Sequence, residues 1–434
     1  MKRQRAGFAI AAGLALVGLS AGLVAGCATA ARGGSGESLR SLLGSHPGLQ
    51  EVAGSPERFR FQAVLGLVEE RPGSRPVLVQ QAFRAGAEYV YPASTVKLFG
   101  AVAALEWLAE LRRETGLPLD VDTPLVFHPL FEGEVVEEGD PSNLIGGQIT
   151  VRHEIRKLFL VSDNQAFNRL YELVGQDRLV ASLAWAGLGE ARIVHRLSEP
   201  RTVEENRRSP RIDFLGREGG GVLYTLPERT SEPLPPPPPV SGLKVGRAHV
   251  GPTDQVVEEP LDFAEKNRIS LTDLQRGLCM VVRPDVDCGG PGFKLSEADR
   301  ALLLEAMSQV PRESRNPAYD PADFPDSYVK YLLPGLTRVV PRERLHVANK
   351  IGQAYGFTTE NAWVTDTGTG RSFFLAATLY TNEDGVLNDD KYDYETVALP
   401  FLADLGAAAA RRLLDSPGFY RQRVRSLAIL RRLP

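Results

Sequence analysis

Hydrophobic and polar side chains alternate along residues 59–67, and this period of two predicts a β-strand. A turn at Pro72-Gly73 separates it from a second apolar run, Val77–Phe83, so the two segments are expected to form a hairpin. Residues 95–113 are instead apolar on nearly all sides, which predicts a long helix buried in the middle of a domain.

Further segments show the period of a helix or of a strand. Thr150 is expected to cap a helix over 151–161, and a break at Ser162-Asp163-Asn164 separates it from a helix that Gly175 ends. The other predicted helices are 270–282, 296–310 and 394–414, and the other predicted strands are 361–365 and 372–381. Strands near both ends with helices between them predict an α+β fold, in which one antiparallel sheet is closed by the two ends of the chain and flanked by a helical subdomain.

The N-terminal residues 1–27 differ in composition from the rest of the chain. A basic start and an apolar run over 8–24 with interspersed small residues are typical of a secretory signal peptide. The run ends in Leu23-Val-Ala-Gly-Cys27, which resembles the lipobox of bacterial lipoproteins and implies acylation of the Cys27 sulfur. An uncleaved membrane helix is the alternative, and either places the body of the protein outside the cytoplasm. Because residue 28 is Ala rather than Asp, the resemblance implies export and a lipid anchor in a bacterial membrane, at the periplasmic face of the outer membrane.

Three segments lack a regular pattern. Residues 28–54 are rich in Gly, Ser and Ala and predict a flexible tether. Residues 207–262 contain a triple glycine and a run of prolines, and they predict an extended, partly disordered surface insertion, either a solvated spacer or a docking ligand for an aromatic groove. Residues 416–434 form a basic tail, either solvated or in contact with anionic lipid. These boundaries leave 55–415 as the main domain.

Composition and charge limit the classes of function. With 43% hydrophobic and 24% charged residues, the chain of 434 residues has a globular composition, and its net charge of -4 gives no electrostatic case for nucleic acid. The six histidines are scattered without metal-ligand spacing, so we predict no metal and no cofactor. We expect a monomer. Cys279 and Cys288 could pair in an oxidising compartment or remain free thiols.

Three short motifs carry candidate chemistry: Ser94-Thr-Val-Lys97, Ser162-Asp-Asn164 and Lys350-Ile-Gly352. On a helix, positions 94 and 97 share a face, so Lys97 is expected beside the Ser94 hydroxyl. Burial lowers the pKa of a lysine, and a neutral Lys97 can accept the serine proton. A serine at the start of a helix also has free backbone N–H groups that stabilise an oxyanion. The alternative is that Ser94 only caps the helix.

The order of these motifs resembles that of the superfamily of class A β-lactamases and penicillin-binding proteins, whose signatures are S-x-x-K, S-D-N and K-T-G. The flanking segments resemble the family as well: Tyr91-Pro-Ala-Ser-Thr-Val-Lys-Leu-Phe99, Ile149-Thr-Val-Arg-His-Glu154, Ser162-Asp-Asn-Gln-Ala-Phe-Asn168 and Ala348-Asn-Lys-Ile-Gly-Gln-Ala-Tyr-Gly356. The resemblance covers residues 55–415 except the insertion. It implies a β-lactamase/transpeptidase-like fold, an α/β sandwich.

The resemblance implies catalytic roles for three residues. Ser94 would be the acylated nucleophile, and Lys97 would be its base or proton relay. Ser162 would bridge protons toward the leaving group, while Asp163 would hold the loop.

Substrate-binding roles are implied in the same way. Asn164 would bond the substrate amide and Lys97, and Lys350 would attract the substrate carboxylate. Gly352 would let the substrate lie close to its strand. The backbone N–H groups of Ser94 and Gln353 would form the oxyanion hole.

Two departures from the family pattern affect these expectations. Ile351 stands where the family has a hydroxyl residue that binds the substrate carboxylate. Arg201 stands where class A enzymes carry the glutamate that activates water for deacylation, with Glu199 nearest and Glu204 and Glu205 further along. Glu199 is therefore the candidate base, and the alternative is that these carboxylates are only solvated surface groups.

The sequence thus predicts a serine hydrolase that is acylated at Ser94 by β-lactams or D-alanyl peptides of peptidoglycan and hydrolyses the acyl-enzyme slowly. The alternatives are a D,D-peptidase or penicillin-binding protein, an esterase on cell-wall substrates, or a binding lipoprotein that kept the fold and lost turnover. The intact serine and lysines favour an enzyme, because a scaffold does not require a buried lysine beside a serine.

Overall fold

The computed structural model describes residues 35–217 and 220–415. The predicted signal peptide with Cys27 and the predicted basic tail over 416–434 lie outside the described residues. Within the described ranges, no helix combines the length and the hydropathy that a membrane span requires.

A five-stranded antiparallel sheet forms the centre of the domain, in the order β12-β13-β14-β1-β2. Its strands are β1 (Gln62–Glu69), β2 (Val77–Phe83), β12 (Leu345–Ala354), β13 (Phe357–Asp366) and β14 (Arg371–Tyr380). The N-terminal and C-terminal strands meet where β1 pairs with β14, for example at Leu65 and Leu375. The prediction of one antiparallel sheet closed by both ends of the chain is confirmed.

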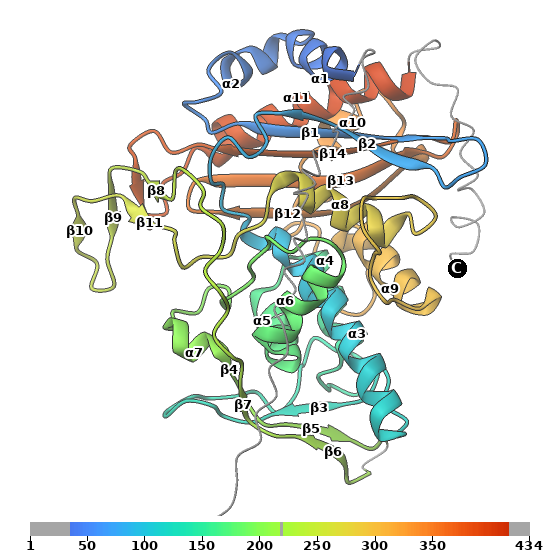
Figure 1. Ribbon diagram of the computed structural model, residues 1–434, viewed down its shortest axis with the longest axis vertical. Coiled ribbons are helices and arrows are strands. Elements are labelled where there is room, and N and C mark those ends of the chain that lie inside the picture. Colours follow the sequence, from blue (N-terminus) through green and yellow to red (C-terminus); the bar gives the residue numbers. More distant parts are fainter. Residues whose placement is uncertain (1–34, 218–219, 416–434) are drawn as a thin grey trace, which may run out of the picture. The chain divides into compact units, whose positions relative to one another are not determined.

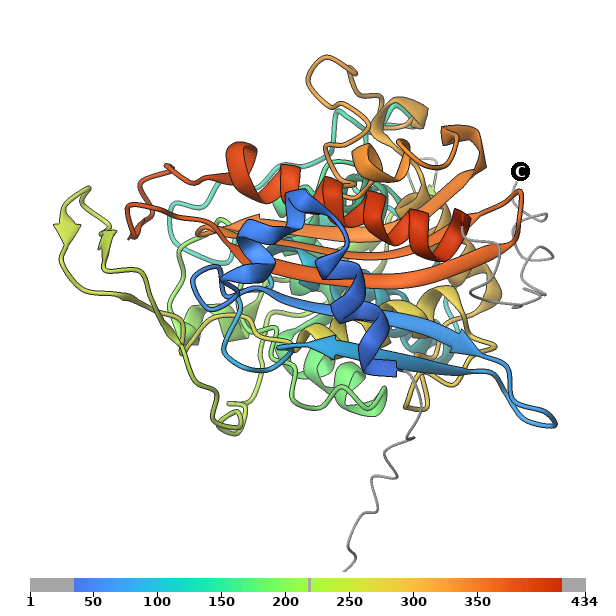
Figure 2. The same cartoon turned by 90° about the horizontal axis from the view of Figure 1, so that it is seen from above.

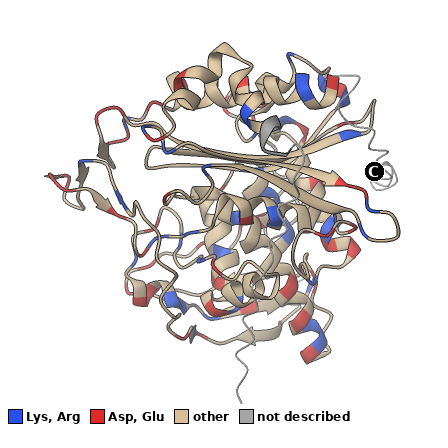
Figure 3. Ribbon diagram, turned by 45° about the horizontal axis from the view of Figure 1, so that its top comes forward, with Lys and Arg blue, Asp and Glu red and all other residues tan. Residues whose placement is uncertain are grey.

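Helices cover both faces of the sheet (Figures 1 and 2). Alternation along the strands explains this, because the consecutive residues Val64 and Leu65 of β1 are buried in hydrophobic clusters on opposite faces. One face carries α11 (Leu399–Ala410) and α10 (Leu333–Leu336), and the other carries α8 (Leu271–Val282) and α9 (Glu297–Ser308). Residues of both charge signs are mixed over the helices and loops, whereas the strands carry few of them (Figure 3).

The helical subdomain packs around α3 (Lys97–Thr115), which is buried along most of its length as its apolar sequence predicted. Around it lie α4 (Val151–Leu160), α5 (Asn164–Val174) and α6 (Gln176–Trp185). The predicted break between α4 and α5 and the end of α5 at Gly175 are confirmed. Helix α6 was not predicted.

The expected flexible tether over 28–54 is corrected for its described part. From Ser35 the chain forms α1 (Ser35–Gly44) and α2 (Gln50–Gly54). Leu39, Leu42 and Leu49 from this stretch are buried with α11 in the cluster on that face of the sheet. These apolar residues stabilise the segment by burial, which the Gly, Ser and Ala content did not reveal.

The segment 207–262, predicted as an extended and partly disordered surface insertion, carries short paired strands in its described part. Its described residues form β4 (Arg208–Ser209), β5 (Ile212–Leu215), β6 (Val222–Leu226), β7 (Arg229–Thr230), β8 (Lys244–Val245), β9 (Ala248–Val250), β10 (Val256–Val257) and β11 (Leu261–Asp262). Two of them pair outside the segment, β5 with β3 (Leu125–Phe127) and β9 with β15 (Val386–Leu387). Strands this short carry too little periodicity for recognition in the sequence.

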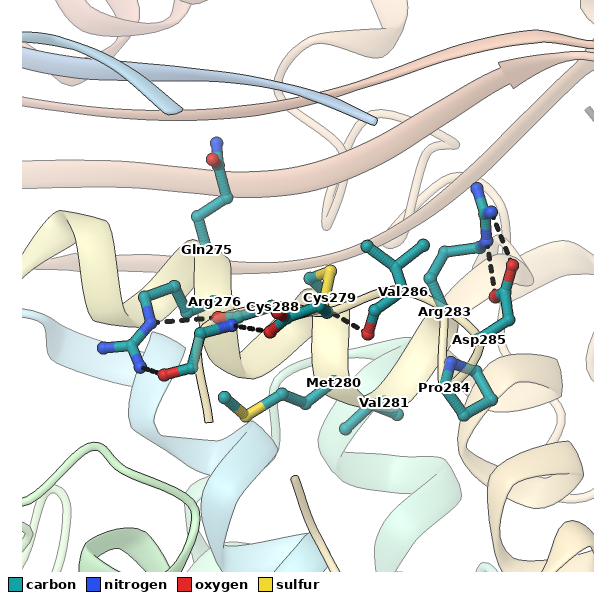
Figure 4. The surroundings of a disulfide bond; sticks show 12 residues. Gln275, Arg276, Cys279, Met280, Val281, Arg283, Pro284, Asp285, Val286 and Cys288 are labelled. Carbon is teal, nitrogen blue, oxygen red and sulfur yellow. Dashed lines mark hydrogen bonds and ion pairs between the residues drawn. A yellow bond between two sulfur atoms is a disulfide. The ribbon is translucent and has the colours of Figure 1, made fainter. Parts of the chain in front are cut away.

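A disulfide joins Cys279 and Cys288, whose Cα atoms are 6.1 Å apart, so the pairing that the sequence left open is present (Figure 4). It connects α8 to the loop that follows it. Arg276 of α8 donates to the Cys288 carbonyl at 3.0 Å, and the Leu78 N–H of β2 donates to the Asp287 carbonyl at 2.9 Å. The disulfide therefore links α8 to the loop after it, and a backbone hydrogen bond links that loop to the edge strand β2.

Candidate active site

Ser94 lies in a short 3-10 turn, η2 (Ala93–Val96), directly before α3. The backbone N–H of Lys97 donates to the Ser94 carbonyl, and Ala93 has a φ of 46°, a left-handed value that costs free energy for a non-glycine residue. The N-cap of α3 is Val96, so Ser94 is not its capping residue. The alternative of a simple N-cap serine therefore does not describe this position.

Lys97 is fully buried and makes three hydrogen bonds to the S-D-N loop. Its Nζ donates to the Ser162 carbonyl, to the Ser162 Oγ at 3.3 Å and to the Asn164 Oδ1 at 2.6 Å. Burial lowers the pKa of Lys97 to about 7, although the charge of Asp163 opposes this shift. A substantial fraction of Lys97 is therefore neutral near neutral pH.

The S-D-N loop is held by contacts on both of its sides. Asp163 caps α5 by accepting from the Ala166 N–H at 2.7 Å, which is the structural role predicted for it. Lys157 of α4 forms ion pairs with Asp163 at 3.6 Å and with the buried Asp140 at 2.6 Å. These contacts fix Ser162, whose φ of 59° is left-handed.

Lys350 enters the same cluster from β12. Its Nζ donates to the Ser162 Oγ at 2.8 Å and to the Ile351 carbonyl at 3.0 Å. Burial, followed by the charge of Lys97, holds the pKa of Lys350 well below its ordinary value. One serine oxygen thus accepts hydrogen bonds from two buried lysines, so a proton can pass between them through Ser162.

Gly352 allows β12 to approach the Ser94 turn. A Cβ atom at this position would lie 2.5 Å from the Pro92 carbonyl oxygen and 3.0 Å from the backbone nitrogens of Ser94 and Thr95. The sequence predicted that Gly352 lets the substrate lie close to its strand. In the structure, it is the Ser94 turn that lies close to Gly352. Gln353 follows directly on the same strand, which is an edge of the sheet.

Ile351 is buried in the hydrophobic cluster that includes α11 residues. Its side chain therefore packs on the opposite face from Lys350, and it supplies no polar group to the cluster around Ser162. This burial agrees with the expectation that position 351 offers no hydroxyl to a substrate carboxylate.

Glu199 does not join the lysine cluster. Its carboxylate accepts from the Arg201 Nε at 2.6 Å and from the Asn168 Nδ2 at 3.3 Å, and among the described residues it has no hydrogen bond or ion pair with Lys97. Arg201 also pairs with Glu134 at 3.3 Å. Glu199 therefore stays a candidate base, with its carboxylate bound by Asn168 of α5 and by Arg201.

Ser198 reaches the cluster instead, and the sequence reasoning missed it. Its Oγ accepts a hydrogen bond from the Asn164 Nδ2 at 2.7 Å. Its only sequence signal is its place directly before Glu199, because which side chain of a loop points inward depends on contacts distant in the sequence.

Replacement of Gly352 by alanine tests the packing of β12 on the Ser94 turn. We expect Gly352→Ala to lower the free energy of unfolding by about 1–3 kcal/mol, because the methyl group meets backbone atoms that no side-chain rotation can move. Chemical denaturation measures this change. Gly54→Ala is the control, because a Cβ at Gly54 of α2 has no neighbour within 4 Å. Equal stability of Gly352→Ala and the wild type would contradict the packing argument.

Comparison with known proteins gives a partial sequence match. Residues 79–214 match the sequence profile of the Beta-lactamase2 family, described as a beta-lactamase enzyme family. This range includes Ser94, Lys97, Ser162 and Asn164, and it ends before Lys350. No curated protein matches the sequence.

Several solved structures are similar over most of the chain. The β-lactamase from Sphaerobacter thermophilus is 14% identical with a TM-score of 0.45, covering 87% of this chain and 98% of that one. The class A β-lactamase from Mycobacterium abscessus is 18% identical with a TM-score of 0.43, covering 84% and 98%. The β-lactamase from Desulfarculus baarsii is 16% identical with a TM-score of 0.45, covering 86% and 98%. The segment that holds Ser94, Lys97 and the S-D-N loop is thus similar in sequence to the beta-lactamase enzyme family.

Proposed function

We propose that the protein is a serine hydrolase of the class A β-lactamase type, acylated at Ser94 by β-lactams or by D-alanyl peptides. The observation that carries this proposal is the cluster beside the Ser94 turn, in which Lys97 and Lys350 both donate to the Ser162 hydroxyl. A buried lysine with a pKa lowered to about 7 is suited to take a proton from a serine at neutral pH.

Acylation then transfers the acyl group of the substrate from its nitrogen to the Ser94 oxygen. The Ser94 Oγ attacks the substrate carbonyl carbon while its proton passes to the neutral Lys97 Nζ. The carbonyl C–N bond breaks, and the leaving nitrogen receives a proton through the Ser162 hydroxyl. The acyl group remains on Ser94 as an ester, and the backbone N–H groups of Ser94 and Gln353 stabilise the oxyanion formed on the way.

Binding of the substrate uses the remaining groups of the cluster. Asn164 uses one Nδ2 hydrogen for Ser198 and keeps the other for the substrate amide. A substrate carboxylate near Lys350 favours its ammonium form, which opposes the effect of burial on the pKa of this lysine. The free edge of β12 offers backbone groups for an extended substrate.

Among the described residues, no carboxylate is hydrogen-bonded to Lys97 that could serve deacylation. Hydrolysis requires a base that removes a proton from water as the ester C–O bond breaks, and a positioned base contributes about 10²–10⁴-fold in rate. Glu199 is occupied by Arg201 and Asn168, and the guanidinium of Arg201 cannot act as a base. The acyl-enzyme is therefore expected to accumulate.

Intact-mass analysis after exposure to penicillin, together with a chromogenic cephalosporin assay, tests the function. We expect a covalent adduct on Ser94 and a burst followed by slow turnover. Ser94→Ala and Lys97→Ala should each abolish the adduct, and the double variant should be little worse than either, because the two groups act as one unit. An adduct without any turnover indicates a penicillin-binding protein. Fast turnover without a burst would contradict slow deacylation. The absence of both an adduct and turnover would contradict β-lactams as the substrate.

The pH dependence of acylation tests the role of Lys97. Only the neutral amine can accept the serine proton, so the rate constant should rise with pH and reach half of its maximum near pH 7. Stopped-flow measurements between about pH 5 and 9 determine this midpoint. A rate constant that is constant or falls over this range would show that Lys97 is not the base.

We further propose that the protein is exported and anchored by a lipid on Cys27. The signal-peptide pattern of the sequence supports this, and so does the disulfide, because disulfides persist in oxidising compartments. Labelling of cells with radioactive palmitate should mark the wild type and not Cys27→Ser. Continued labelling of the variant would exclude Cys27 as the acylated residue.

A further inference from the structure

Ser198 joins the loop over 195–201 to the lysine cluster. It lies in the left-handed region with a φ of 54°, and its Oγ accepts from the Asn164 Nδ2 at 2.7 Å. The other end of the same amide, Asn164 Oδ1, accepts from the Lys97 Nζ at 2.6 Å. The Asn164 side chain is therefore held between Ser198 on one side and Lys97 on the other.

The loop is fixed on both sides of Ser198. Leu197 exchanges two hydrogen bonds with the Asn168 side chain of α5, at 2.8 and 3.0 Å. The buried Arg196 donates to Glu172 at 2.8 Å and to the Arg208 carbonyl at 2.8 Å. On the other side, Glu199 is bound to Arg201. Contacts on both flanks maintain the strained backbone that turns the Ser198 hydroxyl toward Asn164.

We propose that Ser198 is a positioning residue, whose hydroxyl holds the Asn164 side chain against Lys97. The catalytic part of this inference rests on the proposed acylation at Ser94. Ser198 itself lies outside the S-x-x-K, S-D-N and K-x-G motifs, although the Asn164 that it contacts belongs to S-D-N.

Release of Asn164 would change the proton affinity of Lys97. The Asn164 Oδ1 is one of three oxygens that accept from the Lys97 Nζ, and each of these hydrogen bonds favours the ammonium form. The charged groups that act on Lys97 from neighbouring elements are Asp163 of the S-D-N loop and Lys350 of β12, and neither contacts Ser198. Loss of the Ser198 hydroxyl should therefore lower the pKa of Lys97 further.

The test compares Ser198→Gly, Ser198→Asn and the wild type. Glycine accepts the left-handed backbone and removes the hydroxyl, whereas asparagine tolerates this backbone and supplies another acceptor. The titration of Lys97 is followed by NMR of protein labelled with ¹³C at lysine Cε, with Lys97→Arg identifying its signal. The rate constant of acylation by penicillin is measured against pH on the same variants.

For Ser198→Gly we expect the Lys97 midpoint to move to lower pH, and the limiting acylation rate to fall by about two- to tenfold, the usual effect of one lost hydrogen bond. Ser198→Asn should restore both quantities toward the wild type. Asp254→Gly, at a left-handed position in the turn between β9 and β10, is the matched backbone control and should change neither. A general loss of structure would lower the acylation rate without a specific shift of the Lys97 titration midpoint.

Two results would overturn the inference. One is a Lys97 midpoint in Ser198→Gly equal to that of the wild type. The other is the same midpoint in Ser198→Asn as in Ser198→Gly, since the hydroxyl would then not act as an acceptor for Asn164. Because the NMR titration needs no substrate, a shifted midpoint in a protein that penicillin does not acylate would support Ser198 as the positioning residue and contradict β-lactams as the substrate.

Discussion

The Ser162 hydroxyl joins the two halves of the fold, because it accepts hydrogen bonds from a lysine of each. Lys97 comes from α3 of the helical subdomain, and Lys350 comes from the edge strand of the sheet. Burial lowers the pKa of both lysines, and the charge of Lys97 lowers the pKa of Lys350 further. The contact that joins the halves therefore involves a buried amine of lowered pKa, that of Lys97, three residues after Ser94 in the chain.

Buried amines of this kind require surroundings that fix them. The opposite face of β12 carries a second buried network, in which the Lys330 Nζ donates to the Val347 carbonyl at 2.8 Å and to the Asn349 Oδ1 at 2.8 Å. Asn349 in turn donates to Glu360 of β13 at 2.7 Å. Fully paired polar networks of this type restrict a segment to one arrangement. β12 is thus held by polar contacts on one face while it presents Lys350 on the other.

Three non-glycine residues at the site have left-handed backbone angles: Ala93 with a φ of 46°, Ser162 with 59° and Ser198 with 54°. Each costs free energy, and each is maintained by contacts to elements distant in the sequence. The strain lies next to the candidate nucleophile, at the shared hydroxyl and at the loop residue that holds Asn164. The three strained residues are therefore already in place before any substrate binds.

The sequence by itself determined the features that depend on neighbouring residues. The period of two predicted the hairpin of β1 and β2, the apolar run predicted α3, and the break at Ser162 predicted the turn before α5. It also predicted that Lys97 would be buried. These results follow from the geometry of helices and strands, which is local.

Only the tertiary structure decided which residues meet across the fold. The leucines of α1 pack on the sheet instead of forming part of a tether, because a surface for them exists only once the sheet has formed. Gly352 is close to the Ser94 turn because β12 and α3 are brought together from opposite ends of the domain. Ser198 rather than Glu199 reaches Asn164, because Asn168 and Arg201 bind the loop on either side of it. The path of a loop depends on such distant partners, and the order of residues within it does not specify them.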